Sequence, residues 1–359
     1  MSADTVVIGA GQAGLAVGYH LAQRGRDFTI LDAAAEPAAA WRGRWDSLAL
    51  FTPAAHDSLP GRPFPGDPDH YPTRDEVIEY LTGYAAHFGL PVELGCRVER
   101  VACVGENWVV ETGDRAIEAR NVVVATGAFQ APRLPVDLAE RLDPAIQQLH
   151  SAEYRRPSGL RGETMLVVGG GNTGYQIAEE LASAGREVHL AIGTRQMPMP
   201  TRLLGREIFT VLERLGAMRK SADSRIGRRM KGRETLVGYG PRRGRRQGIT
   251  LHDRAASAEG RTVTFAGGGT VRPDAIVWAT GFTRDHAFVD APVFAGGEVV
   301  QKRGVTEAPG LYFCGLPWMH TRGSALLGWV KDDAAFIAQK IAERPNTTPV
   351  PNRIHEVTS

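Results

Sequence analysis

The sequence predicts an α/β fold made of two doubly wound parallel-sheet domains. Three observations predict it: a repeated strand–turn–helix–strand unit, a Gly-rich turn inside each copy, and a repeated strand that runs into Ala-Thr-Gly. The two copies span Thr5–Asp32 and Thr164–Gly193. In each copy a β-branched apolar run precedes Gly-x-Gly-x-x-Gly, a helix-period stretch and a second apolar run, which is the pattern of a Rossmann-like βαβ unit.

The composition is that of a globular protein with two domains of ordinary size. The chain has 359 residues, of which 43% are hydrophobic and 23% charged, so each domain can bury a core. The formal net charge of +2 predicts no nucleic-acid partner and no membrane partner, and no apolar run has the length of a membrane span. Since no signal-peptide pattern opens the chain, we expect a cytoplasmic protein. Three scattered cysteines without Cys-x-x-Cys argue against a dithiol redox centre, and no metal site is expected.

The same short motif, Ala-Thr-Gly, follows each βαβ unit further along the chain, at the end of an apolar strand. In the two copies the motif is Ala125-Thr126-Gly127 and Ala279-Thr280-Gly281. Strands of a doubly wound sheet end at the edge where ligands bind, so we assign these residues to nucleotide sites. Between each unit and its motif, Arg97–Glu111 and Arg261–Phe265 alternate apolar and polar residues, which predicts hairpins that cover the sheet.

The first Gly-rich turn predicts a dinucleotide site. Gly9 permits the tight turn, Gly11 lets backbone amides approach a pyrophosphate, and Gly14 lets helix and strand pack closely. The helix that follows directs its positive N-terminus at the phosphates. Asp32 ends the second strand, where a carboxylate accepts hydrogen bonds from ribose hydroxyls. The turn also contributes Gln12 and Ala13.

The second Gly-rich turn repeats the glycines but not the acid. It consists of Gly169, Gly171, Asn172, Thr173 and Gly174. The position that matches Asp32 is Ile192, and Thr194 and Arg195 follow shortly after it. A carboxylate repels a 2′-phosphate, whereas an Arg and a hydroxyl bind one. The second site therefore predicts NADPH, with NADH as the alternative. Arg202 is a second candidate for the phosphate, and Arg195 as a solvated loop residue is the open alternative.

Two fingerprints, one with the acid and one without, predict two different dinucleotides. The first site suits the adenosine ribose of FAD, and the second would bring NADPH to the flavin. The nicotinamide domain, residues 156–284, would then interrupt a flavin domain formed by residues 1–155 and 285–345. This is a glutathione-reductase-like arrangement, with residues 346–359 as a C-terminal tail.

Three stretches outside the repeats carry further expectations. Residues 214–246, rich in Lys and Arg, read as a solvated, mobile loop or as a rim that attracts the nicotinamide phosphate. A final helix pattern runs from Ser324 to Arg344 and ends before Pro345. Apolar residues just before the basic stretch share one helical face and predict a packed helix: Leu204, Ile208, Val211, Leu212 and Leu215.

With these motifs in place, the chain resembles the class B flavin-containing monooxygenases among the two-dinucleotide flavoproteins. It is most similar to short bacterial members, including those of arsenic operons. The stretches that carry the resemblance are Trp41-Arg42, Trp45–Pro53, Tyr71–Glu76 and Leu149–Tyr154. The last resembles the end of the signature F-x-G-x-x-x-H-x-x-x-[FWY]. Pro144 and Ile146 replace its Phe and Gly, and the Asn that larger members place near the flavin is absent here.

The resemblance implies an enzyme that uses FAD, NADPH and molecular oxygen. A flavin peroxide would oxygenate a small soft nucleophile or a ketone, by sulfoxidation, N-oxidation or a Baeyer–Villiger reaction. The alternative is a flavin reductase that passes electrons to a protein or quinone. The resemblance implies no oligomeric state.

The resemblance also assigns residues, and several assignments keep an alternative. His56 would replace the missing Asn, and His150 and Tyr154 would act in catalysis, although His150 could instead orient a loop. Trp41 and Trp45 would wall the flavin ring or belong to the core. The helix opened by Ser324 would face the ring with its positive end. The further flavin contacts are Arg42, Thr52, Val98 and Gly315.

Overall fold

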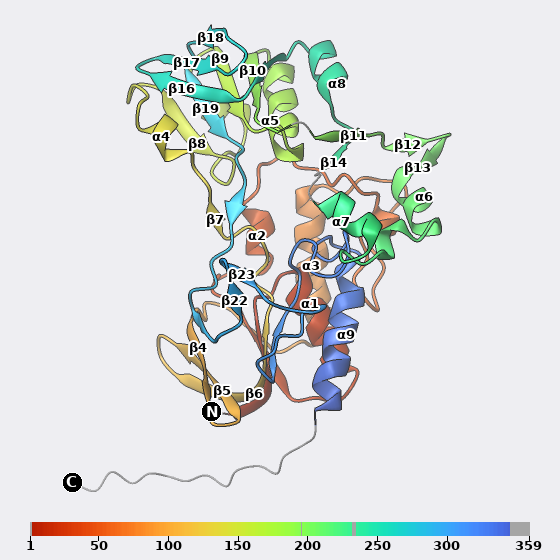
Figure 1. Cartoon of the computed structure of the whole chain (residues 1–359). Helices are drawn as coiled ribbons and strands as arrows, with labels where there is room; N and C mark the ends of the chain where they lie inside the picture. The colour runs from red at the N-terminus through yellow and green to blue at the C-terminus, as the bar shows by residue number, and fades with distance from the viewer. Residues whose placement is uncertain (1, 195, 232–234, 345–359) are drawn as a thin grey trace, which may run out of the picture.

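The computed structural model describes residues 2–194, 196–231 and 235–344, which form two lobes (Figure 1). Arg195 and the tail 346–359 lie outside the described residues. Within the described part of the chain, no helix is long and apolar enough to cross a bilayer. The sequence prediction of two α/β units with parallel sheets is confirmed by this architecture.

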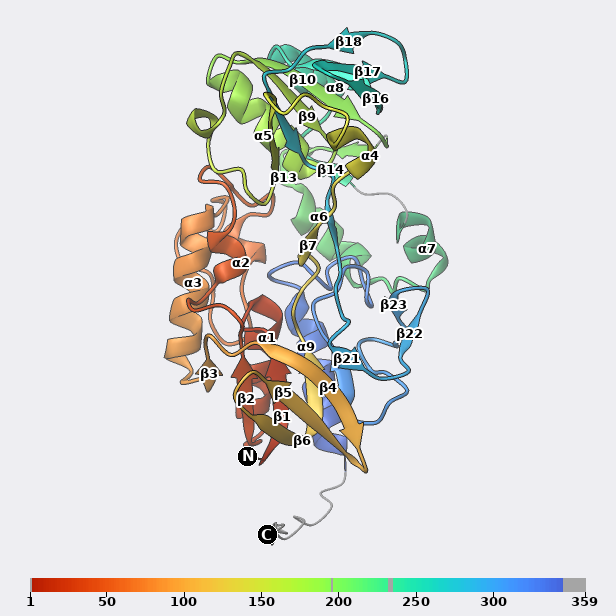
Figure 2. The same ribbon diagram turned by 90° about the vertical axis from the view of Figure 1, so that its left-hand side faces the viewer.

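The lower lobe is built on an eight-stranded sheet whose centre is the first βαβ unit (Figure 2). The sheet runs β21-β4-β5-β6-β1-β2-β3, and β24 pairs with β6. A short hairpin of β22 (Phe294–Ala295) and β23 (Glu298–Val299) lies beside it. The sheet strands are β1 (Ser2–Ile8), β2 (Phe28–Leu31), β3 (Val92–Glu93), β4 (Val98–Val104), β5 (Asn107–Thr112), β6 (Ala116–Val124), β21 (Val289–Asp290) and β24 (Leu311–Phe313).

Local sequence explains why these elements form. Val6 and Val7 of β1 are fully buried, as expected for a central parallel strand covered on both faces. Gly18 lets the first helix approach the sheet, because a Cβ there would lie 2.7 Å from Cδ1 of Ile30. Thr73 and Glu76 form a capping box at the start of α3. The helices of this lobe are α1 (Gln12–Ala22), α2 (Ala39–Arg42), α3 (Arg74–His87) and α9 (Val330–Glu343).

The upper lobe contains a five-stranded, all-parallel sheet in the order β15-β10-β9-β19-β8. Apolar side chains cover both faces of this sheet. A three-stranded antiparallel sheet, which includes the predicted Arg261–Phe265 hairpin, packs beside it. The elements are α4 (Val136–Ala139), β8 (Gln147–His150), the 3-10 turn η2 (Pro157–Gly159), β9 (Thr164–Val168), α5 (Asn172–Ser183), β10 (Glu187–Ile192), α8 (Pro241–Arg246), β15 (Thr250–Asp253), β16 (Ala255–Glu259), β17 (Thr262–Phe265), β18 (Thr270–Val271) and β19 (Ala275–Trp278).

The predicted domain boundary at residue 155 is wrong. Strand β8 pairs in parallel with β19, with His150 opposite Trp278, so residues 147–150 belong to the upper sheet. The chain crosses between the lobes earlier, at β7 (Ala131–Pro132), and returns at β20 (Phe282–Thr283). These two linkers pair with each other as antiparallel strands. The periodicity of β8 alone could not assign it to either sheet.

An inserted segment, residues 197–240, leaves the upper lobe after β10 and packs against the lower lobe. Its Phe209 ring lies 5.7 Å from that of Trp329, and the amide of Ala222 donates to the carbonyl of His320 at 2.7 Å. Much of the basic stretch is therefore folded structure. The elements are β11 (Met197–Met199), β12 (Arg202–Leu203), β13 (Arg206–Glu207), α6 (Ile208–Arg214), the 3-10 turn η3 (Ala217–Arg219), α7 (Arg225–Lys231) and β14 (Thr235–Val237).

The predicted apolar face of the helix in this segment is only partly correct. Ile208 and Phe209 are buried, and Leu212 packs against the same cluster. Leu204, however, precedes the helix in the turn between β12 and β13 and is 96% exposed, and Leu215 follows the helix and is 72% exposed. The helical spacing of apolar residues in the sequence therefore extends beyond both ends of α6, which spans only Ile208–Arg214.

Candidate dinucleotide and active site

The first Gly-rich turn forms a cradle at the carboxyl end of β1. Gly9 has a φ of +107°, and a Cβ there would lie 2.6 Å from the carbonyl oxygen of Ala125, while one at Gly14 would lie 1.8 Å from the carbonyl oxygen of Gly9. A Cβ at Gly11 would meet nothing within 4 Å. Gly9 and Gly14 are therefore required by the protein's own packing, whereas Gly11 faces open space. Helix α1 begins there without a side-chain cap, so its first amides are available to an anion.

The second cradle repeats this geometry at the end of β9. A Cβ at Gly169 would lie 2.1 Å from the carbonyl oxygen of Ala279, and one at Gly174 would lie 1.9 Å from that of Gly169. A Cβ at Gly171 would come no closer than 3.7 Å to another residue. The side chain of Asn172 is already engaged, since it donates to Thr235 and accepts from the amide of Val237.

The two cradles differ at the end of their second strands. Asp32 accepts hydrogen bonds from the amides of Ala10, at 2.7 Å, and Ala34, at 2.9 Å, so its carboxylate is fixed beside the first turn. In the second cradle Ile192 takes the matching place, because a Cβ at Gly170 would lie 2.7 Å from its Cγ2. An apolar side chain thus stands where the first cradle has an acid. Thr194 is exposed close by, and Arg195 lies outside the described residues.

The two linkers meet at the Ala-Thr-Gly motifs. Arg133 donates from Nε and a terminal nitrogen to the carbonyl of Thr280, at 3.0 and 2.8 Å. Nearby, the Arg44 guanidinium lies 4.8 Å from the centre of the Phe129 ring and 5.1 Å from that of Phe282. Burial and the neighbouring Arg155 lower the pKa of Arg44. Sequence reasoning missed this cation between two linker aromatics, because its partners come from distant segments.

His150 lies at the same junction with both ring nitrogens engaged. Its Nε2 donates to the carbonyl of Gly281 at 3.0 Å, and its Nδ1 accepts from the amide of Ala152 at 3.1 Å. Burial lowers its pKa, which favours this neutral form. These contacts favour the interpretation of His150 as a residue that orients a loop over one as an acid or base.

Tyr154 and Trp45 are core residues of the upper lobe rather than walls of a reaction site. Tyr154 is fully buried and donates to Glu180 at 2.8 Å, and burial raises its pKa. Trp45 is 3% exposed and belongs to the same hydrophobic cluster. The catalytic assignment of Tyr154 and the flavin-wall interpretation of Trp45 are therefore corrected.

Trp41 and Gln12 are better placed beside the first cradle. The indole nitrogen of Trp41 donates to Oε1 of Gln12 at 3.2 Å, and Nε2 of Gln12 donates to the carbonyl of Ala325 at 3.0 Å. Half-buried Trp41 contacts the cores of both lobes. The start of α1 is thereby tied to the segment that follows β24.

Ser324 does not open the last helix. Helix α9 begins at Val330, and Ser324 is fully buried in a turn, where its Oγ accepts from the amides of His320 and Thr321. The predicted helix dipole at Ser324 is therefore wrong. The helix-like pattern in the sequence begins in the turn that precedes α9. Gly315 fits its assignment better: its φ is +82°, and a Cβ there would lie 2.6 Å from that of Ala13.

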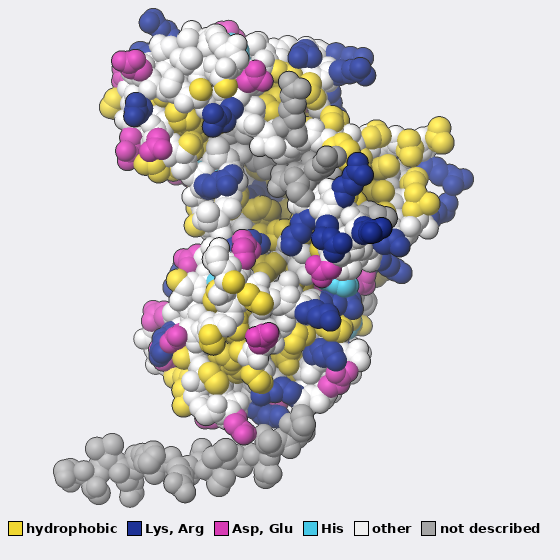
Figure 3. All heavy atoms as spheres, viewed as in Figure 1, with side chains coloured by type: hydrophobic (Ala, Val, Ile, Leu, Met, Phe, Trp, Pro, Cys, Tyr) yellow, Lys and Arg dark blue, Asp and Glu magenta, His cyan; other side chains and the backbone are white. Residues whose placement is uncertain are grey.

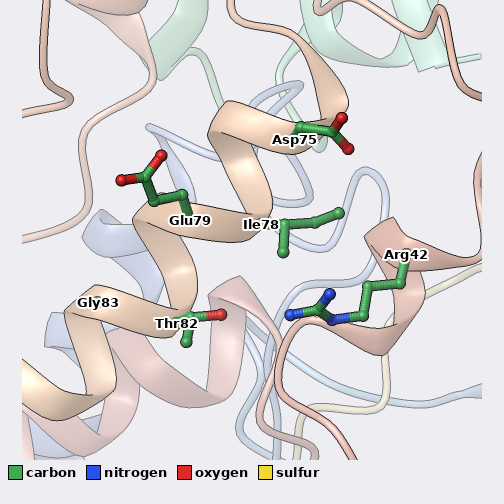
Figure 4. Close-up of a pocket in the computed structure, with 6 residues that line it drawn as sticks. All are labelled: Arg42, Asp75, Ile78, Glu79, Thr82 and Gly83. Atoms are coloured by element: carbon green, nitrogen blue, oxygen red, sulfur yellow. The ribbon is translucent and has the colours of Figure 1, made fainter.

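The other predicted flavin contacts lie apart from one another. Val98 starts β4, and Ala125, Thr126 and Gly127 follow β6, where Gln130 donates to Thr126. Arg42 lines an open depression of about 510 Å³ between α2 and α3 (Figure 4), together with Asp75, Ile78, Glu79, Thr82 and Gly83. Arg42 donates to the carbonyl of Pro37 and lies 3.4 Å from Glu36.

His56 ends the short 3-10 turn η1 (Ala54–His56) and faces the inserted segment. Its Nε2 lies 3.0 Å from the hydroxyl of Thr210, and its Nδ1 lies 3.2 Å from Glu213. Its ring also stacks on that of Trp329. Both nitrogens are thus directed to α6, which makes His56 a contact between the lobes and does not support the expectation that it replaces the missing Asn.

Asp57, the neighbour of His56, is a buried acid that the sequence did not single out. It is 1% exposed, its Oδ1 accepts from Thr52 at 2.7 Å, and its Oδ2 has no hydrogen-bond partner among the described residues. Burial raises the pKa of its carboxyl to about 8. No sequence signal distinguishes this aspartate from an exposed one, because residues from distant parts of the sequence pack around it and bury it.

Comparison with known proteins places this geometry in a family. Residues 6–203 match the pyridine nucleotide-disulphide oxidoreductases. The chain belongs to this family. An uncharacterized CzcO-like oxidoreductase from Geobacillus kaustophilus is 40% identical over 342 residues, covering 94% of this chain and 98% of that one.

Flavin monooxygenases are among the similar proteins. A flavin-containing monooxygenase from Stenotrophomonas maltophilia has 31% sequence identity and a TM-score of 0.80, covering 95% of this chain and 98% of that one. The indole-3-pyruvate monooxygenase YUCCA4 of rice is 34% identical over 223 residues, covering 57% of this chain and 50% of that one. The chain is therefore a FAD-dependent oxidoreductase of the flavin monooxygenase-like group, and the resemblance drawn from Trp41–Pro53 is confirmed.

The disulphide chemistry in the family's name has no counterpart in the cysteines of this oxidoreductase. Cys96, Cys103 and Cys314 are all free thiols. Cys314 is fully buried, and burial raises its pKa, so its reactive thiolate is disfavoured.

Proposed function

We propose that this oxidoreductase is an NADPH-dependent monooxygenase that holds FAD in the first cradle and NADPH in the second. It transfers one atom of molecular oxygen to a small sulfide, amine or ketone. The observation that carries the proposal is the contrast between Asp32 beside Ala10 and Ile192 beside Gly170, within a chain similar over nearly its whole length to a flavin-containing monooxygenase.

The first cradle fits FAD. The open space at Gly11 admits a pyrophosphate, and the uncapped amides of α1 can donate to it. The fixed carboxylate of Asp32 can accept from ribose hydroxyls. Gln12, at the start of α1, contacts both Trp41 and the carbonyl of Ala325. We therefore assign Gln12 and Trp41 to the positioning of the flavin.

The second cradle fits a dinucleotide that carries a 2′-phosphate. A Cβ at Gly171 would meet only the Gln196 side chain, at 3.7 Å, and α5 likewise begins without a side-chain cap. Because Ile192 brings no negative charge, the cradle does not repel a 2′-phosphate. Thr194 and Arg195 are the proposed phosphate contacts, and NADH remains the alternative coenzyme.

The residues of the protein position the cofactors, hold a proton and exclude water. Bound FAD, once reduced by NADPH, supplies the chemistry that activates oxygen. Burial raises the pKa of the Asp57 carboxyl to about 8, which favours its protonated form at neutral pH. Because Oδ1 accepts from Thr52, we assign the proton to Oδ2. The cluster of Ile208, Phe209 and Trp329 closes the inserted segment over this region with apolar side chains, which limits access of water to the reaction.

A reductase that passes electrons to another acceptor is the second candidate. It is favoured by the engagement of His56, the residue expected to replace the missing Asn, with Thr210 and Glu213 of α6. Ile146, at the signature's Gly position, is 3% exposed and part of the upper core.

The two candidates are separated by the fate of the oxygen. The holoenzyme is given NADPH, ¹⁸O₂ and a panel of sulfides, amines and ketones, and hydrogen peroxide is measured in parallel. The proposal predicts one labelled oxygen atom in a product. Absence of labelled product throughout the panel, with faster reduction of an artificial electron acceptor than of oxygen, would establish the reductase instead.

A further inference from the structure

The β12–β13 hairpin projects from the molecule (Figure 1). Leu203, at the end of β12, and Leu204, in the turn, are two adjacent exposed leucines at its tip. Leu203 is 45% exposed and Leu204 is 96% exposed. Leu204 also has a φ of +50°, in the left-handed region that a γ-branched apolar residue rarely occupies. The chain therefore keeps a leucine where folding gains no burial from it and the backbone disfavours it. Such a conflict between local preference and structure marks functional positions.

Exposed Arg202 and Arg206 flank this apolar tip on the hairpin itself, and further basic residues follow in the same segment. Arg206, Arg214, Lys220, Arg229 and Lys231 have no ion pair with a carboxylate anywhere in residues 2–194, 196–231 and 235–344. In Figure 3, hydrophobic side chains gather over the hairpin and Lys and Arg side chains border them toward α7. In this view the inserted segment is thus apolar at the hairpin and positive on the side toward α7.

Two acids of the same segment contact the lower lobe, while Asp223 is exposed. Glu207 caps α6 by accepting from the amide of Thr210 and lies 3.5 Å from His56. Glu213 contacts His56 and Trp329 of the lower lobe. Because these two carboxylates are engaged with His56 and Trp329, Asp223 is the exposed acid that remains among the Lys and Arg of residues 197–231. The whole-chain charge of +2 conceals this local excess of positive charge, which is why composition alone predicted no membrane partner.

We propose that the β12–β13 hairpin docks this oxidoreductase on an anionic membrane surface, with Leu203 and Leu204 inserted among the lipid chains. A projecting tip with two leucines, flanked by Arg202 and Arg206, matches the interfacial region of a bilayer that carries negative headgroups. The contact is peripheral and involves no membrane span.

Vesicle co-sedimentation of the holoenzyme tests the proposal. Wild-type protein should bind vesicles of equal parts phosphatidylglycerol and phosphatidylcholine, should bind pure phosphatidylcholine weakly, and should detach as salt is raised. Leu204→Asn should weaken binding to the anionic vesicles about tenfold or more, since one inserted leucine is lost. Arg206→Ser combined with Arg229→Ser should weaken binding and reduce its dependence on salt.

Leu204→Asn also separates docking from folding. Asn accepts the left-handed backbone better than Leu, so the variant should melt at or above the wild-type temperature. Val104→Asn is the matched control, because Val104 is 63% exposed on the β4–β5 hairpin of the other lobe, and it should leave vesicle binding unchanged. The proposal is overturned if anionic vesicles do not bind, or if Leu204→Asn binds as wild type does. It is also overturned if Leu204→Asn instead dissociates a dimer seen by light scattering, which would assign the tip to a second copy of the chain.

Discussion

Glu213 contacts His56 across the two lobes, with 3.2 Å between its Oε2 and the Nδ1 of His56. The other oxygen of the same carboxylate accepts from the indole nitrogen of Trp329 at 2.9 Å. The rings of His56 and Trp329 stack, with centroids 5.5 Å apart and an interplanar angle of 12°. One carboxylate of the inserted segment therefore holds two side chains of the lower lobe in place.

We expect this contact to couple the inserted segment energetically to the lower lobe. In a double-mutant cycle, His56→Ala and Glu213→Ala should show a coupling energy of about 1 kcal/mol in denaturant unfolding, because the two side chains are in direct contact. His70 and Glu76 form a matched control pair on the surface, with side chains 43% and 44% exposed, and should couple more weakly. Equal coupling in the two pairs would contradict a special role for the contact between lobes.

The raised pKa of Asp57 predicts an unusual dependence of stability on pH. Its folded pKa of about 8 exceeds the ordinary value near 4 of the unfolded chain. Between those pH values the folded state binds the extra proton, so stability falls as pH rises through this window and levels off above pH 8. The groups that face Asp57 are Thr52, Glu207 and Tyr80.

Asp57→Asn removes this titration and should gain stability relative to wild type as pH rises. The difference in unfolding free energy between variant and wild type should shift in the variant's favour by a few kcal/mol from about pH 5 to pH 8. Guanidinium unfolding of both proteins at the two pH values measures it. A difference that is the same at both values would show that Asp57 ionises normally in the folded protein.

The open space at Gly11 predicts a variant that folds but does not hold FAD. Gly11→Val places a side chain where no protein atom lies within 4 Å, so we expect a soluble, colourless protein. Gly14→Ala, in contrast, meets the carbonyl oxygen of Gly9 and should destabilise the fold itself. Flavin absorbance and circular dichroism of both variants check this. A yellow Gly11→Val protein with full flavin content would refute the assignment of the first cradle.

The second cradle predicts that coenzyme choice depends on one position. Ile192→Asp should recreate the arrangement of Asp32 and shift preference from NADPH to NADH by roughly ten- to a hundredfold in KM ratio, since a carboxylate repels the 2′-phosphate and accepts from ribose hydroxyls. Ile192→Asn, which has the same shape without the charge, should shift it less. Equal shifts for Asp and Asn would mean that charge at this position does not select the coenzyme.

Arg195→Ala tests the proposed phosphate contact. It should raise the KM for NADPH roughly ten- to a hundredfold and leave that for NADH nearly unchanged, because a charge-assisted hydrogen bond to phosphate is worth about 1.5–3 kcal/mol. Steady-state kinetics with both coenzymes provide the measurement. If both KM values rise together, the residue does not recognise the phosphate.

Both nucleotide cradles were predictable from sequence because their constraints are local. Gly9 and Gly14 are required by contacts with nearby residues or with the adjacent strand. The Gly-x-Gly-x-x-Gly pattern therefore predicts the local fold directly. The hairpins around Arg97–Glu111 and Arg261–Phe265 were also predictable, since alternation alone defines them. The matching of Asp32 with Ile192 followed from simple spacing along two copies of one unit.

The details of the reaction site were not predictable, because they depend on contacts between distant segments. His56 and Glu213 lie 157 positions apart in the sequence, and nothing in either neighbourhood announces the pair. The spacing of apolar residues predicted a helix that begins at Ser324 and a packed Leu204. Both residues lie before the first residue of the helix concerned, since α9 begins at Val330 and α6 at Ile208. Tyr154 matched a signature position, yet its burial against Glu180 became visible only in the folded chain.

Transfer of ¹⁸O from ¹⁸O₂ to a thioanisole-type sulfide, with NADPH as the reductant and peroxide quantified alongside, tests the central claim most directly. We predict a singly labelled sulfoxide whose formation requires both FAD and NADPH. Part of the NADPH should be lost to peroxide, because Pro144 and Ile146 depart from the monooxygenase signature and His56 is engaged with α6. Sulfoxide without label, or NADPH oxidation that yields only peroxide with every substrate class tested, would contradict the assignment of this oxidoreductase as a monooxygenase.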